Sequence, residues 1–316
     1  MMRHTVSLAI LLCCLVANTP SQKAPGHIQQ PIIDVHMHCY TQQDWQDNNI
    51  PNPVTGKSLT AKDANEHFSE TLAQMKRYHI VKGMISNNFE YDVALAWRKK
   101  EPGRFLVGYG FDDPSKVDIE LLRREIKSVR IDAIGEVDPQ YLGIAPNDLR
   151  LDPIFALAEE MDIPVGFHIH PGPMGAVYKG SPEMRQSINS PLLLEDVIIK
   201  HPKLRLYVMH AGYPRLDEMI NMLYAYPQLY VDIGVIDWTR PKKEFHYYLR
   251  RLVEAGFGDR IMFGSDQMTW TDAIPMAIKN VRSATFLTEK QKRDIFYNNA
   301  VRFFRLKEIE AANSKR

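Results

Sequence analysis

The sequence contains little cysteine, and most of it lies at the amino terminus. Of the 3 cysteines in 316 residues, Cys13 and Cys14 fall within residues 1–22, and Cys39 is the other. If residues 1–22 are removed, Cys39 has no partner within the chain for a disulfide. The mature chain is therefore not a disulfide-stabilised scaffold, and its stability must come from a hydrophobic core.

The sequence also lacks an excess of charge of either sign. It has 39 lysines and arginines against 38 acidic residues, and it has no basic run. Loss of Arg3 together with the rest of residues 1–22 would make the chain neutral. Electrostatic capture of nucleic acid or of an anionic membrane is therefore not expected, and the expected partner is a small-molecule substrate. The sequence is compatible with a homo-oligomer without indicating one.

Hydrophobic runs long enough to cross a membrane are absent. One apolar run covers residues 6–17, follows a single charged residue, Arg3, and gives way to polar sequence. A run of this length is too short to span a bilayer and is typical of a secretory signal peptide. Residues 1–22 are thus predicted to be a signal peptide, and the protein to be periplasmic or secreted. The alternative is a buried amino-terminal helix.

What the sequence does contain is a series of short apolar segments, most of them rich in valine, isoleucine or phenylalanine. Such segments are too apolar for half-exposed strands and are typical of parallel strands buried on both faces. The segments are residues 32–38, 81–86, 105–110, 132–137, 164–170, 205–212, 229–235 and 260–266.

Helical patterns lie between these segments, and two of them carry a start signal. Asp152 and Ser190 each precede a proline and are predicted to cap a helix. The repeated alternation of strand and helix predicts an α/β fold, a (β/α)₈ TIM barrel, as one catalytic domain over residues 31–306. Residues 307–316 form a polar carboxyl-terminal tail. No Gly-x-Gly-x-x-Gly follows the first segment, which argues against a dinucleotide-binding fold.

Two histidines end the first apolar segment, in the order Asp34-Val35-His36-Met37-His38. Side chains two residues apart on a strand point the same way, so both imidazoles would face the mouth of the barrel. Active sites of this fold lie at the carboxyl ends of the strands. His36 and His38 are therefore predicted to bind one metal ion.

The fifth and sixth segments also end in histidine. His168 closes the fifth strand, and His170 lies two residues further on, just before a Pro-Gly turn. We expect His168 to be the metal ligand, because a ligand belongs at the strand end. His170 would contact substrate, support a ligand or lie in solvent. His210 ends the sixth segment before two small residues, which leave room for a ligand or substrate. The alternative for His210 is a core histidine bonded to backbone.

Carboxylates end two further segments. Asp266 follows an apolar run, where a carboxylate is costly unless it is paired or metal-bound. It is predicted to ligate metal and to accept a proton from metal-bound water, the alternative being a salt bridge. Glu136 could bridge two metals, support a ligand or contact substrate. Asp34 lies one layer below His36, where a buried hydrogen bond is expected, and Asp232 is ambiguous.

Together these motifs resemble the amidohydrolase superfamily, and specifically its amidohydrolase 2 (amidohydrolase-related) branch, over residues 31–306. The matching motifs are Asp34-Val35-His36-Met37-His38, Pro164-Val165-Gly166-Phe167-His168, Met209-His210-Ala211-Gly212 and Phe263-Gly264-Ser265-Asp266. The resemblance implies that a divalent metal, often zinc, is bound by four residues, His36, His38, His168 and Asp266. It also implies that His210 is a second-metal ligand or a catalytic acid/base.

The resemblance leaves the metal number and the reaction open. No lysine ends the fourth segment, so a carbamylated lysine bridge is not suggested. Glu136 there resembles the TatD-like nucleases, although the neutral charge argues against a nucleic-acid substrate. One ion is slightly favoured, because the branch usually has one. The branch contains hydrolases and also non-oxidative decarboxylases.

The favoured reaction is hydrolysis of a small ester, lactone or amide. A divalent metal lowers the pKa of bound water to about 7, and Asp266 would carry its proton to the leaving group. The metal and His210 would stabilise the oxyanion. Three nitrogen ligands and one carboxylate suit zinc, with iron and manganese as alternatives.

Decarboxylation of a small aromatic or unsaturated acid is the second hypothesis. A non-catalytic metal- or ligand-binding barrel is the third, and it is disfavoured because no central ligand is missing.

Specificity is expected to lie in the loops that follow the strands. These loops carry Tyr40, Trp45, Tyr178, Arg185, Trp238 and Trp270. Aromatic walls with one arginine would suit a small ring-bearing or carboxylate-bearing substrate. His170, Arg185 and Trp270 are predicted to contact it.

Overall fold

The computed structural model describes residues 30–307, in which 8 parallel strands form one sheet in the order β1 to β8. This order confirms the predicted (β/α)₈ barrel. The predicted signal peptide, residues 1–22, and nearly all of the predicted tail lie outside the described residues. The strands are β1 (Ile32–His38), β2 (Ile80–Ser86), β3 (Phe105–Phe111), β4 (Ala133–Val137), β5 (Val165–His168), β6 (Leu206–Met209), β7 (Tyr230–Asp232) and β8 (Ile261–Met262).

Backbone hydrogen bonds close the sheet into a barrel. The Val35 amide donates to the Phe263 carbonyl at 2.9 Å, and the Asp266 amide donates to the His36 carbonyl at 2.8 Å. These bonds join β1 to the segment that continues β8. The first and last strands therefore meet, and the carboxyl ends of all the strands converge on one face.

The later strands are shorter than the apolar segments that predicted them. The residues just after these strands adopt positive φ angles, with 57° at His210, 57° at Val235 and 45° at Asp266. A left-handed residue cannot continue an extended strand. The segments that follow these strands therefore turn at the mouth of the barrel. His210 and Asp266 lie on such turns, directly above the strands.

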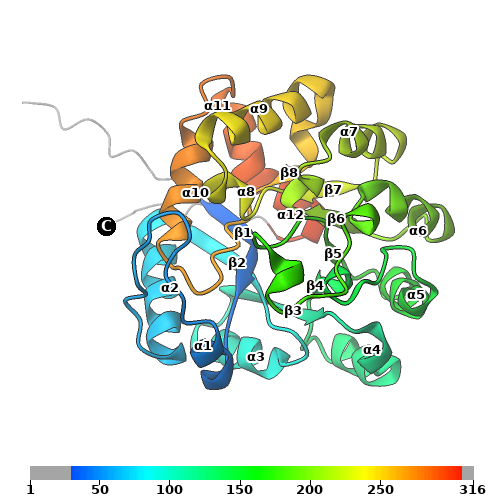
Figure 1. Cartoon of the computed structure of the whole chain (residues 1–316), viewed down its shortest axis with the longest axis horizontal. Coiled ribbons are helices and arrows are strands. Elements are labelled where there is room, and N and C mark those ends of the chain that lie inside the picture. The colour runs from blue at the N-terminus through cyan, green and yellow to red at the C-terminus, as the bar shows by residue number, and fades with distance from the viewer. Residues whose placement is uncertain (1–29, 308–316) are drawn as a thin grey trace, which may run out of the picture.

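Helices surround the barrel, and Figure 1 looks onto the face where the strands end. They bury the outer faces of the strands in a large hydrophobic core. Within residues 30–307, no helix is both long and apolar enough to cross a membrane. The helices are α1 (Gln42–Asp47), α2 (Ala64–Tyr78), α3 (Tyr91–Lys100), α4 (Ile119–Lys127), α5 (Asp152–Glu160), α6 (Glu195–Lys200), α7 (Leu216–Ala225), α8 (Ile236–Thr239), α9 (Lys242–Leu252), α10 (Ala273–Arg282), α11 (Glu289–Arg293) and α12 (Asn299–Phe304).

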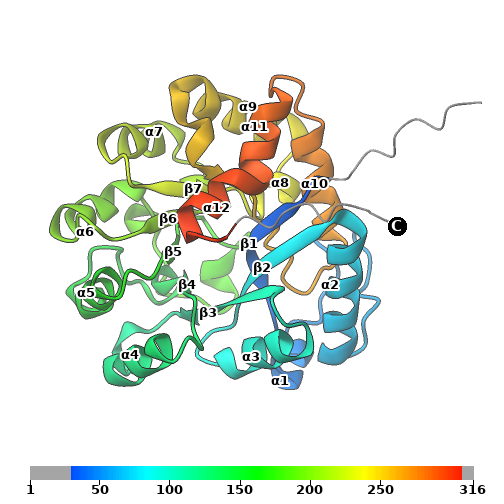
Figure 2. The ribbon, with the colours of Figure 1, turned by 180° about the vertical axis from the view of Figure 1, so that it is seen from behind.

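The interior of the barrel is filled below the strand ends. The Tyr207 hydroxyl of β6 donates to the Val35 carbonyl of β1 at 3.3 Å, and these two strands are not neighbours, so the ring crosses the interior. Its ring also contacts Phe303 of α12, with centroids 5.4 Å apart. Figure 2 shows α12 lying across the opposite end of the barrel. The open end is therefore the face at which the strands finish.

Candidate metal centre

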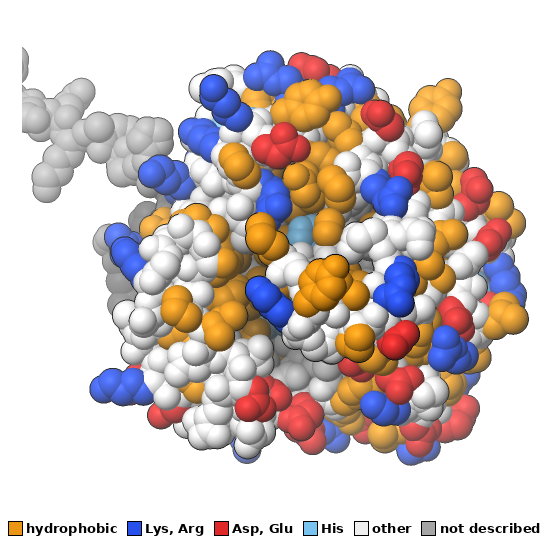
Figure 3. Space-filling model, viewed as in Figure 1, with side chains coloured by type: hydrophobic (Ala, Val, Ile, Leu, Met, Phe, Trp, Pro, Cys, Tyr) orange, Lys and Arg blue, Asp and Glu red, His pale blue; other side chains and the backbone are white. Residues whose placement is uncertain are grey.

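The predicted ligands meet at the carboxyl ends of the strands. His36 and His38 come from β1, Glu136 from β4 and His168 from β5, while His210 and Asp266 stand on the turns after β6 and β8. All but His38 are buried. Figure 3, in the same view as Figure 1, shows a histidine at the floor of a hollow in this face, with hydrophobic side chains around it.

The Glu136 carboxylate lies between two pairs of histidines. Its Oε2 atom is 3.5 Å from His36 Nε2 and 3.3 Å from His38 Nε2. Its Oε1 atom is 3.7 Å from His168 Nε2 and 3.4 Å from His210 Nε2. Each oxygen of the Glu136 carboxylate therefore faces its own pair of imidazole nitrogens.

Asp266 completes the first of these groups. Its Oδ1 atom is 3.0 Å from His38 Nε2 and 3.7 Å from His36 Nε2. Its other oxygen, Oδ2, is 3.9 Å from His210 Nδ1, on the side of the second pair. Asp266 therefore lies between both pairs at the mouth, while His168 belongs with His210 rather than with the pair from β1.

The other ring nitrogen of three of these histidines is held by the protein. His36 Nδ1 is 3.1 Å from Asp232 Oδ2, His210 Nδ1 is 3.0 Å from the Gly234 carbonyl, and His168 Nδ1 is bonded to the Gln140 amide. The bonds of His36 and His210 place the ring hydrogen on Nδ1 and leave the Nε2 lone pair for a metal ion, and the contact with the Gln140 amide fixes the orientation of the His168 ring. The role of Gln140 could not be predicted from the sequence, because it follows β4 without any metal-ligand spacing.

Two aspartates below the histidines hold the backbone of the site. Asp232 Oδ1 accepts from the amides of His210 at 3.1 Å and Gly234 at 2.8 Å. Asp34 Oδ1 accepts from the amides of His36 at 3.2 Å and Ser265 at 2.9 Å. These are buried hydrogen bonds, as the sequence predicted for Asp34. The ambiguous Asp232 is thus a support for two histidines.

The residues present fit a divalent cation. Three buried atoms that face the cluster, His36 Nε2, His210 Nε2 and Asp266 Oδ1, make only the ion-pair contacts given above and no well-formed hydrogen bond among the described residues. Orphaned buried polar atoms are costly, and a cation would satisfy all three. Imidazole nitrogens and carboxylate oxygens together are ligands that zinc and similar divalent metals accept.

Electrostatics keeps the carboxylates ionised. Burial raises the pKa of Asp266, but His36 and His38 outweigh that effect and lower the pKa to about 2. Burial lowers the pKa of His38, but Asp266 and Glu136 outweigh it and raise the pKa to about 9. In contrast, burial and the neighbouring His210 lower the pKa of His168 to about 3, so its imidazole is neutral. A divalent cation would displace the protons held by the β1 histidines.

His170 lies beside the cluster without joining it. Its ring centroid is 5.0 Å from that of His210, and its Nδ1 accepts the Gly172 amide hydrogen at 3.2 Å. Burial, followed by the nearby His210, holds its pKa well below the usual range. The turn therefore binds one ring nitrogen of His170, as expected for a residue that begins the Pro-Gly turn.

Arg185 and Trp270, the other two residues predicted to contact substrate, donate hydrogen bonds to backbone carbonyls of the loops. The exposed Arg185 donates to the carbonyls of Pro182 and Met184 at 2.7 and 2.9 Å. The buried Trp270 donates to the Ile50 carbonyl at 2.9 Å. Among the described residues, no hydrogen bond, ion pair or ring contact joins either side chain to the metal centre.

Other aromatic rings lie against the histidines. The Tyr40 ring is 6.3 Å from His38, and the Tyr141 ring is 5.4 Å from His168. Tyr213 lies 6.1 Å from His170. Of these, only Tyr40 was expected from the sequence, since Tyr141 and Tyr213 lie in short turns whose direction the sequence does not indicate.

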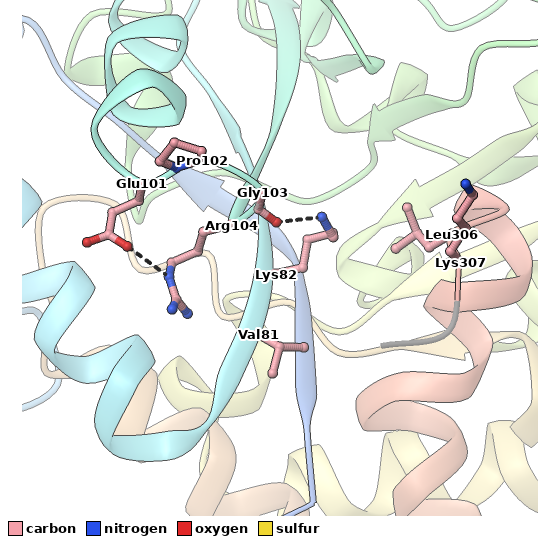
Figure 4. Close-up of a pocket in the computed structure, with 8 residues that line it drawn as sticks. All are labelled: Val81, Lys82, Glu101, Pro102, Gly103, Arg104, Leu306 and Lys307. Atoms are coloured by element: carbon pink, nitrogen blue, oxygen red, sulfur yellow. Dashed lines mark hydrogen bonds and ion pairs between the residues drawn. The ribbon is translucent and has the colours of Figure 1, made fainter. Parts of the chain in front are cut away.

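A separate hollow of about 470 Å³ lies at the other end of the barrel, between the starts of β2 and β3 and the end of the described chain. Figure 4 shows its lining, in which Lys82 donates to the Gly103 carbonyl at 2.7 Å. It contains no histidine. Because active sites of this fold lie at the carboxyl ends of the strands, this hollow contributes nothing to the metal centre.

Comparisons with known proteins agree with this geometry. A family model described as amidohydrolase matches residues 33–306. No curated protein matches the sequence. Among solved structures, an uncharacterised TIM-barrel protein from Bordetella bronchiseptica is similar, with a TM-score of 0.68 at 17% identity, and the match covers 87% of this chain and 99% of that one.

Two further solved structures are similar in fold. One is described as a 2-pyrone-4,6-dicarboxylic acid hydrolase from Acinetobacter baumannii, with a TM-score of 0.60 at 14% identity, covering 86% of this chain and 98% of that one. The other is a dihydroxybenzoic acid decarboxylase from Polaromonas with bound manganese, with a TM-score of 0.60 at 14% identity. The match covers 90% of this chain and 99% of that one.

Proposed function

The chain belongs to the amidohydrolase family, and we propose that it is a metal-dependent enzyme that hydrolyses a small ester, lactone or amide. The observation that carries this proposal is the position of Glu136, whose two oxygens each face two histidine Nε2 atoms beside the ionised Asp266. A cluster of this kind, open at the barrel mouth, suits the activation of water.

We propose that the site holds two ions. His36, His38 and Asp266 would hold one, His168 and His210 the other, and Glu136 would bridge them. The sequence slightly favoured one ion. The separation of the ligands into two groups, one on each oxygen of Glu136, supports two. Zinc is the metal proposed from the ligand types, with manganese, which the Polaromonas structure contains, as the alternative.

Asp266 is the residue that would move the proton. Bound metal would supply a Lewis acid that activates water and polarises the substrate carbonyl. The Asp266 carboxylate, whose Oδ1 lies beside the β1 histidines and whose Oδ2 faces His210, would accept the proton and deliver it to the leaving group. His210 donates from Nδ1 to the Gly234 carbonyl, so its neutral form has a lone pair on Nε2. That tautomer suits a metal ligand better than a proton donor.

The second candidate is decarboxylation of an aromatic or unsaturated acid. The Tyr40 and Tyr141 rings lie against two histidines of the site and could enclose a planar ring. The likeness to the Polaromonas decarboxylase is also compatible with this reaction, although it rests on fold at 14% identity.

One assay separates the two candidates. Purified protein loaded with zinc or manganese would be offered a panel of lactones, aryl esters and amides, and a panel of aromatic acids. We expect acid release from the first panel without carbon dioxide from the second, and no release by His36→Ala. Carbon dioxide alone would favour the decarboxylase, and inactivity on both panels would refute the hydrolase proposal.

A further inference from the structure

Three loops on one side of the metal centre bring together His170, Tyr213 and Arg240. They follow β5, β6 and β7 respectively. The His170 and Tyr213 ring centroids are 6.1 Å apart, and Arg240 Cζ lies 5.7 Å from the centroid of the Tyr213 ring. Because His170 is also 5.0 Å from His210, this group, here called the mouth subsite, adjoins the metal ligands.

Arg240 is half-buried and has no acidic partner within residues 30–307. The one hydrogen bond of its side chain within these residues runs from Nε to the neutral Thr239 hydroxyl at 3.4 Å. Arg215, in the preceding loop, differs: it forms an ion pair with Glu218 at 2.9 Å. The two terminal nitrogens of Arg240 thus remain free to donate. A partly buried cation without a counter-charge favours binding of an anion.

His170 supplies a second donor beside the same Tyr213 ring. A backbone amide can only donate, so the bond from Gly172 occupies the lone pair of His170 Nδ1 and places the ring hydrogen on Nε2. His170 Nε2 is buried and has no partner among the described residues. An unpartnered buried N–H is a hydrogen-bond donor that awaits an acceptor.

We propose that the mouth subsite binds a carboxylate carried by the substrate. The Arg240 guanidinium would donate to both carboxylate oxygens, and His170 Nε2–H would add a bond to one of them. The Tyr213 ring, beside the guanidinium of Arg240, would fix the orientation of the guanidinium plane. The sequence assigned the arginine role to Arg185, and this structure assigns it to Arg240. The identity of the reaction at the metal rests on the proposed function, whereas binding at the mouth subsite does not.

The test is binding rather than turnover. Benzoate and its uncharged counterpart benzamide would be titrated calorimetrically into wild-type holoprotein and into Arg240→Met, Arg240→Lys and Arg185→Met. Metal content and thermal unfolding would be measured for every variant. We expect Arg240→Met to weaken benzoate by about tenfold or more and to leave benzamide unchanged. Arg240→Lys should be intermediate, because lysine keeps the charge without the planar fork.

The Arg185 variant distinguishes the two arginines. Arg185→Met should bind benzoate as the wild type does, since its guanidinium is engaged with loop carbonyls. Equal benzoate affinity in wild type and Arg240→Met would overturn the proposal, because benzoate would then be held by the metal alone. Failure of the wild type to bind benzoate at millimolar concentration would also overturn it. Benzoate binding through Arg240 without hydrolysis of any ester would reject the proposed reaction and leave the subsite intact.

Discussion

At the scale of single residues, Glu136 decides the charge balance of the metal centre. Burial raises its pKa, but the charge of His36 and the contacts with the neighbouring histidines outweigh burial and hold the pKa well below the usual range. A carboxylate in this position offers an oxygen and a negative charge to both histidine pairs. A neutral amide keeps the shape but cannot balance two divalent charges.

We therefore expect Glu136→Gln to lower the metal content from two ions per chain towards one, measured by elemental analysis after dialysis. The matched control is Asp138→Asn, the same acid-to-amide change at a neighbouring residue that no hydrogen bond or ion pair among the described residues joins to the histidines. Its metal content should equal that of the wild type. A wild-type protein with a single ion, retained in Glu136→Gln, would contradict the two-ion arrangement.

His67 provides a prediction away from the metal ligands. It is buried in α2, and its Nε2 donates to the Met268 carbonyl at 3.0 Å. Burial outweighs this hydrogen bond and lowers its pKa to about 3. The folded chain therefore keeps His67 neutral at pH values where the unfolded chain, with a histidine pKa of about 6.5, takes up a proton. Stability is lost as pH falls below about 6.5.

Between pH 7 and pH 5, the wild type should lose about 2 kcal/mol more of its unfolding free energy than His67→Gln does. Glutamine can donate to the same carbonyl but does not titrate. Other buried histidines contribute equally to both proteins and cancel in the difference. Urea unfolding of both proteins at the two pH values gives the comparison. An equal loss in both would mean that His67 is already charged in the folded chain.

The convergence of the candidate metal ligands could be predicted from the sequence, whereas the directions of the loop side chains could not. His36, His38, His168, His210 and Asp266 could be predicted to converge because each ends a strand, and strand ends of a barrel meet on one face. The directions of loop side chains have no such constraint. Arg185 turns back to its own loop carbonyls.

At the scale of elements, one of the two predicted caps is observed. Ser190 caps its segment, with its hydroxyl accepting the Leu192 amide hydrogen at 3.2 Å. Asp152 does not cap α5: it is already the first helical residue, because a 3₁₀ turn, Leu149–Leu151, precedes it. Its carboxylate is instead bonded to His201 Nε2 at 3.0 Å. The prediction that Asp152 caps α5 was wrong, because its carboxylate bonds His201 at the end of α6 instead of the backbone of α5.

The packing of β5 against β6 leaves no room for a side chain at Gly166. A Cβ atom at Gly166 would lie 2.5 Å from Cζ and the hydroxyl of the buried Tyr207. Tyr207 cannot move freely, because it is bonded to the Val35 carbonyl and packed against Phe303. Overpacking of a filled core costs about 1–3 kcal/mol.

Gly166→Ala should therefore destabilise the protein by about 1–3 kcal/mol in chemical unfolding. In a Tyr207→Leu background, which removes the clashing ring atoms, the same change should cost clearly less. Equal costs in both backgrounds would show that the strain arises from the backbone of β5 rather than from the ring.

At the scale of the whole molecule, the metal centre joins strands that are far apart in the sequence. Its ligands come from β1, β4 and β5 and from the turns after β6 and β8, so a bound ion links both halves of the barrel. Without it, buried atoms such as His36 Nε2 and His210 Nε2 make no well-formed hydrogen bond among the described residues. A ligand that binds only the folded state stabilises it, by about 2.7 kcal/mol at a concentration one hundred times its Kd.

Removal of metal by a chelator should therefore lower Tm by on the order of 5 °C or more, measured by scanning calorimetry, and added zinc or manganese should restore it. The control is His36→Ala with Glu136→Gln, in which both groups of ligands are damaged. Its Tm should respond little to chelator, because little metal is bound to remove. Because the ligands are spread around the barrel, removal of metal should shift the whole thermal unfolding transition to lower temperature. It should not produce a separate early unfolding phase. A wild-type Tm indifferent to chelator, in protein shown to have lost its metal, would mean that the barrel is held by its core alone and that the ions serve only the chemistry.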